Sequence, residues 1–183
     1  MIDVKIEITN GRYLSSIQRD DKEALIEHLK AKEIYERTAL IPYPYSEADA
    51  DWWINTRLEA RKNLEREVVF GIRNPDGHLI GAIGAQLEEI GLHHRAEFGY
   101  WLAKPYWGQG ITTDAVRVFI RYAFSELKLS KLTADVFAFN TASARVLEKN
   151  GFQKEGYLRQ HYFKDGKFID AIAYGLLKQD LRS

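Results

Sequence analysis

The sequence predicts an α+β fold organised around a mixed β-sheet. Three observations carry this prediction: hairpin signals near both ends of the chain, two strand–loop–helix units between them, and no linker, repeat or low-complexity tract. Hairpins give antiparallel strand pairs and strand–helix–strand units give parallel ones, so both kinds of pair are expected in one sheet. We therefore expect a single domain over residues 1–183, with its recognisable motifs between about residues 12 and 178.

Two short strands are expected at the start of the chain. Residues 1–7 alternate apolar and charged side chains, the pattern of a strand with one buried face. Asn10-Gly11 favours a tight hairpin turn, and residues 13–17 give the returning strand. Because this start lacks the continuous apolar stretch of a signal peptide, we expect no targeting segment and a cytoplasmic protein.

Two helices are expected next. Asp20 and Asp21 are placed to cap a helix whose apolar side chains follow helical spacing. Prolines then force a short extended stretch, because each excludes helix at its own position. Ser46 and Asp49 resemble a capping box that opens a helix reaching about residue 64.

Turn and cap signals predict the remaining elements. First come strands over 68–72 and 79–87, joined by the turn 74–77, and then a loop over 88–94. A strand over 96–102 leads to a helix over 112–127, and a strand over 132–139 leads to a helix from Asn140 to 150–151. The last element is a hairpin of strands over 157–163 and 168–177. Alternation along the strand over 96–102 places Phe98, Tyr100 and Leu102 on an apolar face. Glu97 lies on the opposite face.

Composition narrows the function classes. Lys plus Arg equals Asp plus Glu at 26 each, so the basic excess of a duplex-binding protein is lacking and no direct nucleic-acid contact is expected. The chain has no cysteine, which excludes disulfides, cysteine-ligated metals and a thiol nucleophile. Adjacent His93 and His94 would point apart on a strand, so we expect no metal site. No apolar stretch approaches the length of a membrane span.

The most informative segment is the glycine-containing turn that leads into the helix over 112–127. Gly108 and Gly110 permit positive φ and close approach of the backbone to a ligand, and the first N–H groups of a helix are unpaired. This combination suits a phosphate or pyrophosphate, the alternative being a turn that only redirects the chain. No Walker A motif occurs, and Thr113 stands where a dinucleotide fingerprint needs its third glycine.

This turn resembles the acetyl-CoA motif of the GCN5-related N-acetyltransferase (GNAT) family. The family pattern Gln/Arg-x-x-Gly-x-Gly/Ala maps onto residues 107–112, and residues 140–152 match its Asn-x-x-Ser/Ala…Glu-Lys-x-Gly-Phe segment. Tyr-Trp-Gly-Gln-Gly after Gly-Tyr-Trp-Leu is similar to the RimJ/RimL branch, which acetylates N-terminal amines of ribosomal proteins. The resemblance covers nearly the whole chain and implies a mixed, mostly antiparallel central sheet of about seven strands with about four helices.

The resemblance implies acetyl-CoA as co-substrate and assigns residues to its binding. Main-chain groups of Trp101, Leu102 and Ala103 would pair with the pantetheine arm as an added strand does, and the turn amides would hold the diphosphate. Lys104, Arg145 and Lys149 are candidates for the 3′-phosphate. The expected cofactor-binding residues are Trp101, Leu102, Ala103, Trp107, Gly108, Gln109, Gly110, Ile111, Thr112, Thr113, Asn140, Ser143 and Arg145.

Three positions depart from the family pattern. Trp107 and Thr112 replace polar and small residues of the acetyl-CoA motif, which changes side chains but leaves the backbone donors. Many relatives have a tyrosine before Glu-Lys, proposed to protonate the departing thiolate, and Leu147 occupies that position here. A different acid, or none, is therefore expected.

Acyl transfer to an amine requires a neutral amine and an accommodated thiolate. Without cysteine an acyl-cysteine intermediate is impossible, so direct attack in a ternary complex is expected. Glu97 is the candidate base, with a solvated carboxylate as the alternative, and His94 is a second candidate. Ser143 is the candidate acid or thiol-site hydrogen bonder, unless its hydroxyl only bonds a helix carbonyl.

The acceptor is expected to be a primary amine, with a protein N-terminus preferred. A polyamine, an amino acid or an aminoglycoside is the alternative, and a non-catalytic acyl-CoA-binding module is an alternative of another class. Glu88 and Glu89 are placed to attract a cationic acceptor. Four aromatic residues are candidates for the acceptor cleft or the core: Tyr43, Tyr45, Trp52 and Trp53. The subunit number is left open, a homo-oligomer included.

Overall fold

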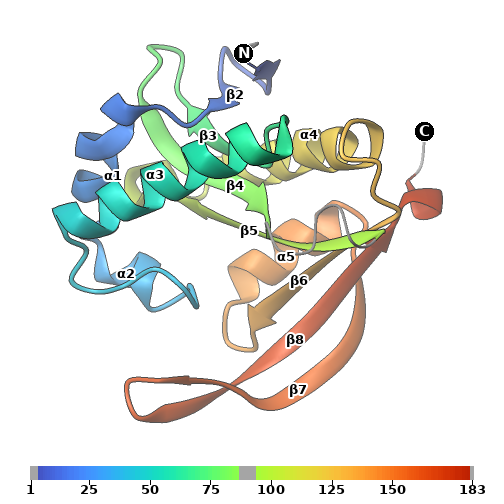
Figure 1. Ribbon diagram of the computed structural model, residues 1–183. Coiled ribbons are helices and arrows are strands. Elements are labelled where there is room, and N and C mark those ends of the chain that lie inside the picture. Colours follow the sequence, from blue (N-terminus) through green and yellow to red (C-terminus); the bar gives the residue numbers. More distant parts are fainter. Residues whose placement is uncertain (1–3, 87–93, 182–183) are drawn as a thin grey trace.

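Strands in one twisted sheet form the centre of the molecule, with helices on both faces (Figure 1). The computed structural model describes residues 4–86 and 94–181. Within these residues the strands are β1 (Lys5–Glu7), β2 (Tyr13–Ser16), β3 (Val69–Arg73), β4 (Leu79–Ala85), β5 (Arg95–Leu102), β6 (Lys131–Phe137), β7 (Gln153–Lys164) and β8 (Lys167–Leu177). The helices are α1 (Lys22–Leu29), α2 (Lys32–Tyr35), α3 (Glu47–Leu64), α4 (Ile111–Ser125) and α5 (Thr141–Lys149), with 3₁₀ turns at Arg19–Asp21, Lys104–Tyr106 and Lys178–Asp180.

The sheet is mixed, as the sequence predicts. The strand order is β1-β2-β3-β4-β5-β6-β8-β7, and every neighbouring pair is antiparallel except β5 with β6. The eight strands and five α-helices of the described residues slightly exceed the expected seven and four. The first strand is very short, and the four-residue helix α2 has too few residues to show helical periodicity.

Helix starts are set by local hydrogen bonds. The capping box of α3 is confirmed, because the Asp49 amide donates to Ser46 Oγ at 3.2 Å and the Ser46 amide donates to Asp49 Oδ2 at 2.8 Å. Asp21 occupies the N-cap position of α1, but the prediction that its side chain caps this helix is wrong. Its carboxylate accepts from the Gln18 amide and from Arg73 instead, because a buried guanidinium needs a counter-ion.

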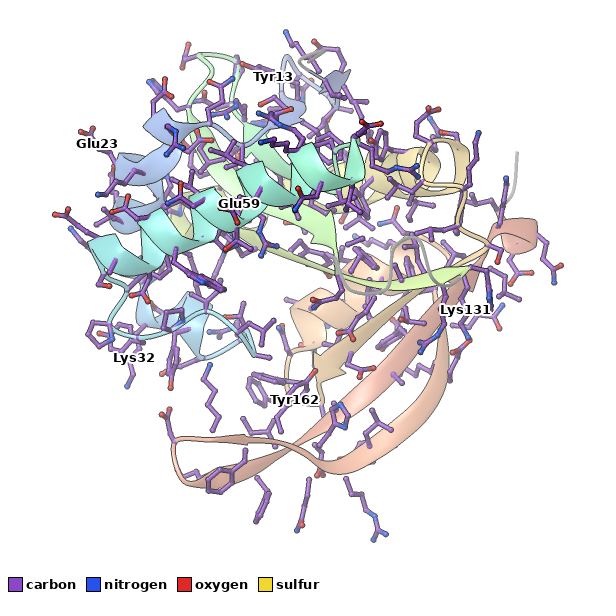
Figure 2. All side chains as sticks on the ribbon, viewed as in Figure 1. Tyr13, Glu23, Lys32, Glu59, Lys131 and Tyr162 are labelled. Carbon is purple, nitrogen blue, oxygen red and sulfur yellow. The ribbon has the colours of Figure 1, made fainter. Side chains whose placement is uncertain are left out.

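The apolar core occupies both faces of the sheet. Helices α1 and α3 cross one face of β3–β5, and α4 lies on the other (Figure 1). On the α4 side, Phe98 stacks against Phe119 and Phe152, with ring centroids 5.8 and 5.4 Å apart. Charged side chains such as Glu23 and Glu59 point away from this core (Figure 2). No helix of the described residues is long and apolar enough to cross a bilayer.

The feature that positions the site is the short pairing of β5 with β6. These parallel strands pair only from Arg95–Lys131 to Glu97–Thr133. Beyond that point β5 continues along β4, and β6 continues along β8. The two strands therefore separate in the middle of the sheet and leave main-chain groups of β5 facing a gap.

Arg73 holds the β2–β3 end of the sheet to α1. Its guanidinium donates to Asp21 at 2.7 and 2.9 Å and to Ser15 Oγ at 2.6 Å, and both charged side chains are more than nine-tenths buried. Removing one partner would leave a desolvated charge without its counter-ion.

We predict that Arg73→Ala lowers the free energy of unfolding by about 3–5 kcal/mol, because Asp21 is left buried and unpaired. Lys32→Ala, which removes an exposed ion pair with Glu36, is expected to change it by less than about 0.5 kcal/mol. Urea denaturation followed by circular dichroism measures both values. Equal stability losses in the two variants would contradict the structural role of Arg73.

Candidate active site

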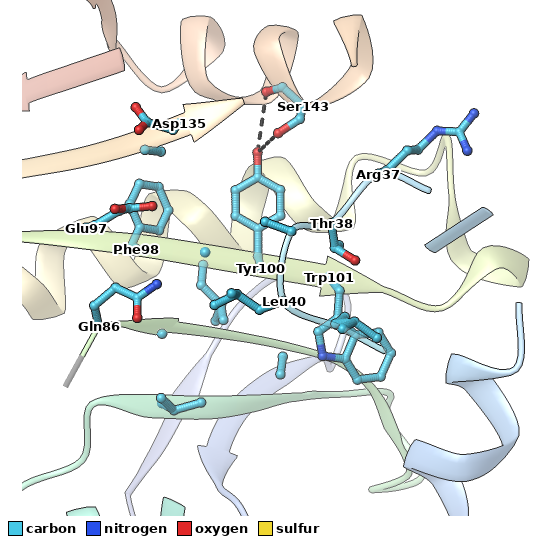
Figure 3. Close-up of a pocket in the computed structure, with 18 of the residues that line it drawn as sticks. Arg37, Thr38, Leu40, Gln86, Glu97, Phe98, Tyr100, Trp101, Asp135 and Ser143 are labelled. Carbon is cyan, nitrogen blue, oxygen red and sulfur yellow. Dashed lines mark hydrogen bonds between the residues drawn. The ribbon is translucent and has the colours of Figure 1, made fainter. Parts of the chain in front are cut away.

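A cavity of about 440 Å³ lies where β5 and β6 separate. It is lined by side chains from both faces of β5: Tyr100 on the α4–α5 side, and Glu97 and Trp101 on the α3 side. The cavity therefore passes through the sheet, from a side where α5 contributes Ser143 (Figure 3) to a side where α3 contributes Trp53 and Arg57. Two reactants entering from opposite faces of the sheet can meet in such a passage.

Two carboxylates line the α3 side of the passage. Glu97 on β5 and Asp135 on β6 share this face, since Glu97 is the register partner of Thr133. Tyr162 lines the same cavity, and burial, followed by the negative charges of Glu97 and Asp135, raises the pKa of Tyr162 to about 12. His161 Nε2 lies 3.2 Å from Asp135 Oδ2. This side of the cavity suits a cationic amine and a proton acceptor.

Two hydroxyls meet on the α5 side of the passage. Tyr100 Oη lies 2.8 Å from Ser143 Oγ, in the first turn of α5 (Figure 3). Burial raises the pKa of Tyr100 to about 12, so the phenol keeps its proton at neutral pH. The sequence pattern predicted only that Tyr100 lies on an apolar face, and the contact of its hydroxyl with Ser143 was not predicted. A tyrosine among phenylalanine and leucine on a buried face was the available signal.

The turn before α4 has the backbone geometry that the sequence predicts. Gly108 and Gly110 have φ of +75° and +78°, and a Cβ at either position would meet nothing within 4 Å. The Asp114 amide makes the first helical bond, to the Gly110 carbonyl, so the amides of residues 111–113 precede the hydrogen-bonded ladder of α4. These amides lie at the positive end of a 15-residue helix, a geometry that suits a diphosphate.

Side chains of the same turn brace it against neighbouring segments. The Trp107 indole N–H donates to the Leu102 carbonyl at 2.7 Å, and Gln109 Nε2 donates to the Pro105 carbonyl at 3.1 Å. The Arg37 guanidinium lies over the Trp107 ring, 5.5 Å from its centroid. The two side chains thus fix the turn, and their main-chain groups remain the candidates for ligand contact.

The main-chain groups of β5 that face the gap differ by one residue from the expectation. The Ala103 amide donates to the Ile80 carbonyl on β4, and the Gln86 amide donates to the Glu97 carbonyl. Because hydrogen-bonded positions alternate in an antiparallel pair, odd-numbered residues 97–103 bond to β4 and even-numbered residues 98–102 face β6. Trp101 and Ala103 thus have main-chain groups that bond to β4, whereas those of Tyr100 and Leu102 face the gap, and the Leu102 carbonyl accepts from the Trp107 indole.

The segment after β6 places the remaining candidates at different depths. Asn140 caps α5 as predicted, since its Oδ1 accepts from the Ser143 amide at 3.3 Å, and it lines the cavity. Leu147 is fully buried in the apolar core, and its hydrocarbon side chain has no proton to donate. Arg145 is exposed outside the cavity lining, and Lys104 is paired with Glu33.

The remaining residues predicted from the sequence contribute unequally to the cavity lining. His94 is exposed before β5 and is not among the residues that line the cavity, whereas Glu88, Glu89 and His93 lie outside the described residues. Of the aromatic candidates, Tyr43 is exposed and outside the lining, and three contribute to it: Tyr45, Trp52 and Trp53. Within residues 4–86 and 94–181, no group of three His, Asp or Glu side chains is arranged to hold a metal ion.

The rim of the cavity joins distant parts of the chain. Lys164 Nζ, near the tip of the β7–β8 hairpin, donates to the carbonyls of Tyr35 and Thr38 at 2.5 and 2.6 Å. Tyr35 Oη donates to Asp165 Oδ1 at 2.6 Å. These bonds hold the segment from α2 to α3, which includes the lining residue Leu40, beside the hairpin.

Comparisons with known proteins agree with this geometry. Residues 13–153 match the family model "Acetyltransferase (GNAT) domain". Over 126 residues, 68% of this chain and 70% of the relative, the chain is 39% identical to the probable N-acetyltransferase YjcK of Bacillus subtilis. A solved structure of ribosomal-protein-S5-alanine acetyltransferase from Vibrio fischeri shares the fold, with a TM-score of 0.84, 21% identity and coverage of 99% of this chain and all of that one.

Two relatives with defined acceptors match over shorter stretches. Spermidine N(1)-acetyltransferase of Escherichia coli is 35% identical over 98 residues, 53% of this chain and 52% of the relative. The [ribosomal protein uS5]-alanine N-acetyltransferase of Escherichia coli is 28% identical over 112 residues, 61% of this chain and 58% of the relative. The chain thus aligns with little more than half of each of these two relatives, whose names give different acceptors.

The passage through the sheet, the glycine turn before α4 and the match over residues 13–153 define one class, the acetyl-CoA-dependent N-acetyltransferases. The chain belongs to the acetyltransferase (GNAT) family. Acetyl-CoA is the co-substrate of this class, and solved relatives are named as complexes with acetyl-CoA and with coenzyme A. A Cβ at Gly110 would meet nothing within 4 Å, so the start of the helix is open to an anionic ligand at this point.

We predict that Gly110→Ala weakens coenzyme A binding by about tenfold or more, because a Cβ would project into the space next to the turn amides. Isothermal titration calorimetry measures the affinity. Gly166→Ala is a matched control, since Gly166 also has positive φ (+73°) and an open Cβ position but lies in the β7–β8 turn. Equal affinity losses in both variants would trace the effect to backbone strain instead of the turn.

Proposed function

We propose that this chain transfers the acetyl group of acetyl-CoA to the N-terminal α-amine of a protein, by direct attack in a ternary complex. The observation that carries the proposal is the passage between β5 and β6, with a carboxylate on one side and a protonated phenol on the other. An N-terminal amine is supported by the relative named for alanine acetylation of ribosomal protein uS5. A polyamine acceptor is the second candidate, supported by the spermidine relative and by the two carboxylates of the α3 side.

The thioester arm enters from the α5 side in this proposal. Its amide groups pair with the main chain of Tyr100 and Leu102 across the gap, and its diphosphate binds the amides that start α4. The acetyl carbonyl then lies between the two hydroxyls of the α5 side and the carboxylates of the α3 side. The amine approaches from the α3 side and reaches the carbonyl carbon.

Two proton transfers complete the reaction. Glu97 takes one proton from the ammonium form of the acceptor, directly or through water, so that a neutral nitrogen attacks the carbonyl carbon, and Glu97 later releases this proton to solvent. The C–S bond breaks as the amide forms, Tyr100 gives its proton to the thiolate, and the second proton of the attacking nitrogen restores the Tyr100 hydroxyl through water and Ser143. Tyr100 thereby takes the place of the tyrosine that the family pattern puts at Leu147.

We predict that Glu97→Gln lowers kcat/KM by about 100-fold at pH 7, because general base catalysis contributes about that much. The deficit is expected to shrink as pH rises to about 9.5, where an amine of pKa about 8 deprotonates without help. A pH series of coenzyme A release, read with a thiol reagent, measures this. A constant deficit across pH would remove Glu97 as the base.

We predict that Tyr100→Phe lowers kcat by about tenfold or more and changes coenzyme A affinity little, because only the proton donor is removed. The pKa of about 12 keeps wild-type Tyr100 protonated, so this residue should cause no loss of wild-type activity up to pH 10. Tyr122→Phe is the matched control, since its hydroxyl donates to the Glu67 carbonyl away from the cavity lining. Unchanged kcat in Tyr100→Phe would refute the donor role.

The acceptor class is tested with the same thiol assay. N-terminal peptides with free amines, identical peptides with acetylated N-termini, and spermidine are compared as acceptors. Turnover confined to free-amine peptides supports the proposal, and turnover confined to spermidine supports the second candidate. Thermal stabilisation by acetyl-CoA without any turnover would identify a non-catalytic acyl-CoA-binding module instead.

A further inference from the structure

The α3 wall of the cavity carries a guanidinium with an unpartnered nitrogen. Arg57 lines the cavity, and its Nε is buried with no hydrogen-bond partner among the described residues. The guanidinium carbon lies 5.7 Å from the centroid of the Trp53 ring. Trp53 is one helical turn earlier and lines the same cavity, so the ring helps to fix where the guanidinium lies.

Two other arginines are paired with carboxylates, although the Nε of Arg61, like that of Arg57, has no hydrogen-bond partner. Arg73 makes five hydrogen bonds, to Asp21 and to oxygens of three other residues. Arg61, one turn after Arg57, lies 3.5 Å from the buried Glu67 carboxylate. Neither of these arginines lines the cavity. Arg37 also lines the cavity, but its guanidinium donates to the Glu33 carbonyl and lies over the Trp107 ring, whereas the Nε of Arg57 has no hydrogen-bond partner among the described residues.

Burying the Nε–H of a guanidinium without a hydrogen-bond acceptor is costly, and burial lowers the pKa of Arg57. A bound anion would offset this cost, and a planar guanidinium accepts a carboxylate through two parallel hydrogen bonds. The position is specific, since α3 covers the side where Glu97 and Asp135 line the same cavity. A ligand that satisfies both charges carries an ammonium and a carboxylate.

We propose that Arg57 binds a carboxylate of the acceptor, so that the preferred substrate is an amine with a carboxylate nearby. This inference rests on the proposed function and names the substrate class of that site. In a protein N-terminus the carboxylate is supplied by an aspartate or glutamate next to the amine. A free amino acid offers the same chemistry through its α-carboxylate.

The test measures binding separately from turnover. Calorimetry on the coenzyme A complex compares a peptide beginning Ser-Glu with one beginning Ser-Gln, in wild type and in Arg57→Gln. Wild type is expected to bind the acidic peptide about 10–100-fold more tightly, because a charge-assisted hydrogen bond contributes about that factor. Arg57→Gln is expected to remove the difference. Lys62→Gln, an exposed position on α3 outside the cavity lining, is expected to keep it.

Each outcome decides something different. Equal binding of both peptides to wild type, together with equal binding of an amino acid and its amide, overturns the inference. A preference that survives in Arg57→Gln, with the fold verified by circular dichroism, also overturns it. A preference for the amino acid over its amide, with no peptide preference, supports Arg57 and assigns the acceptor to free amino acids. Acidic-peptide binding without any acetylation would support Arg57 and reject the proposed function.

Discussion

The separation of β5 from β6 is the constraint on which the site depends. A fully paired ladder would satisfy every main-chain group along both strands, and no passage would exist. Here the pairing stops at Glu97 and Thr133, because each strand follows a different neighbour afterwards. The polar main-chain groups beyond this point require another partner, and in the proposed function an extended amide-bearing arm supplies one. The gap that weakens the sheet is thus the feature that creates a binding site.

Much of the fold was predictable because local signals and tertiary packing agree. Ser46 with Asp49, the turn after Arg73 and the Asn140 cap each have short-range chemistry that fixes an element's end. The failures arise where tertiary contacts override local preference. Asp21 is an ordinary capping residue by sequence, yet its carboxylate is recruited by Arg73, 52 positions away. No local sequence pattern indicates a contact between residues so far apart in the chain.

The site was predictable in outline but not in its pairings. The turn at Gly108 and Gly110 was predictable, because few residues other than glycine adopt positive φ before a helix. Which β5 amides face the gap depends on the register with β4, and one residue of parity shifted the expected set. Tyr100 and Arg57 were missed because a sequence does not show the hydrogen-bond partner of a hydroxyl, nor that a guanidinium Nε has no hydrogen-bond partner.

The bonds from Lys164 to the carbonyls of Tyr35 and Thr38 join segments well over a hundred positions apart. Contacts of such long sequence separation form late, because the intervening chain must be ordered before they close. During synthesis the rim of the cavity therefore waits for the last two strands to leave the ribosome. A nascent chain would hold much of its core before it holds a competent acceptor pocket.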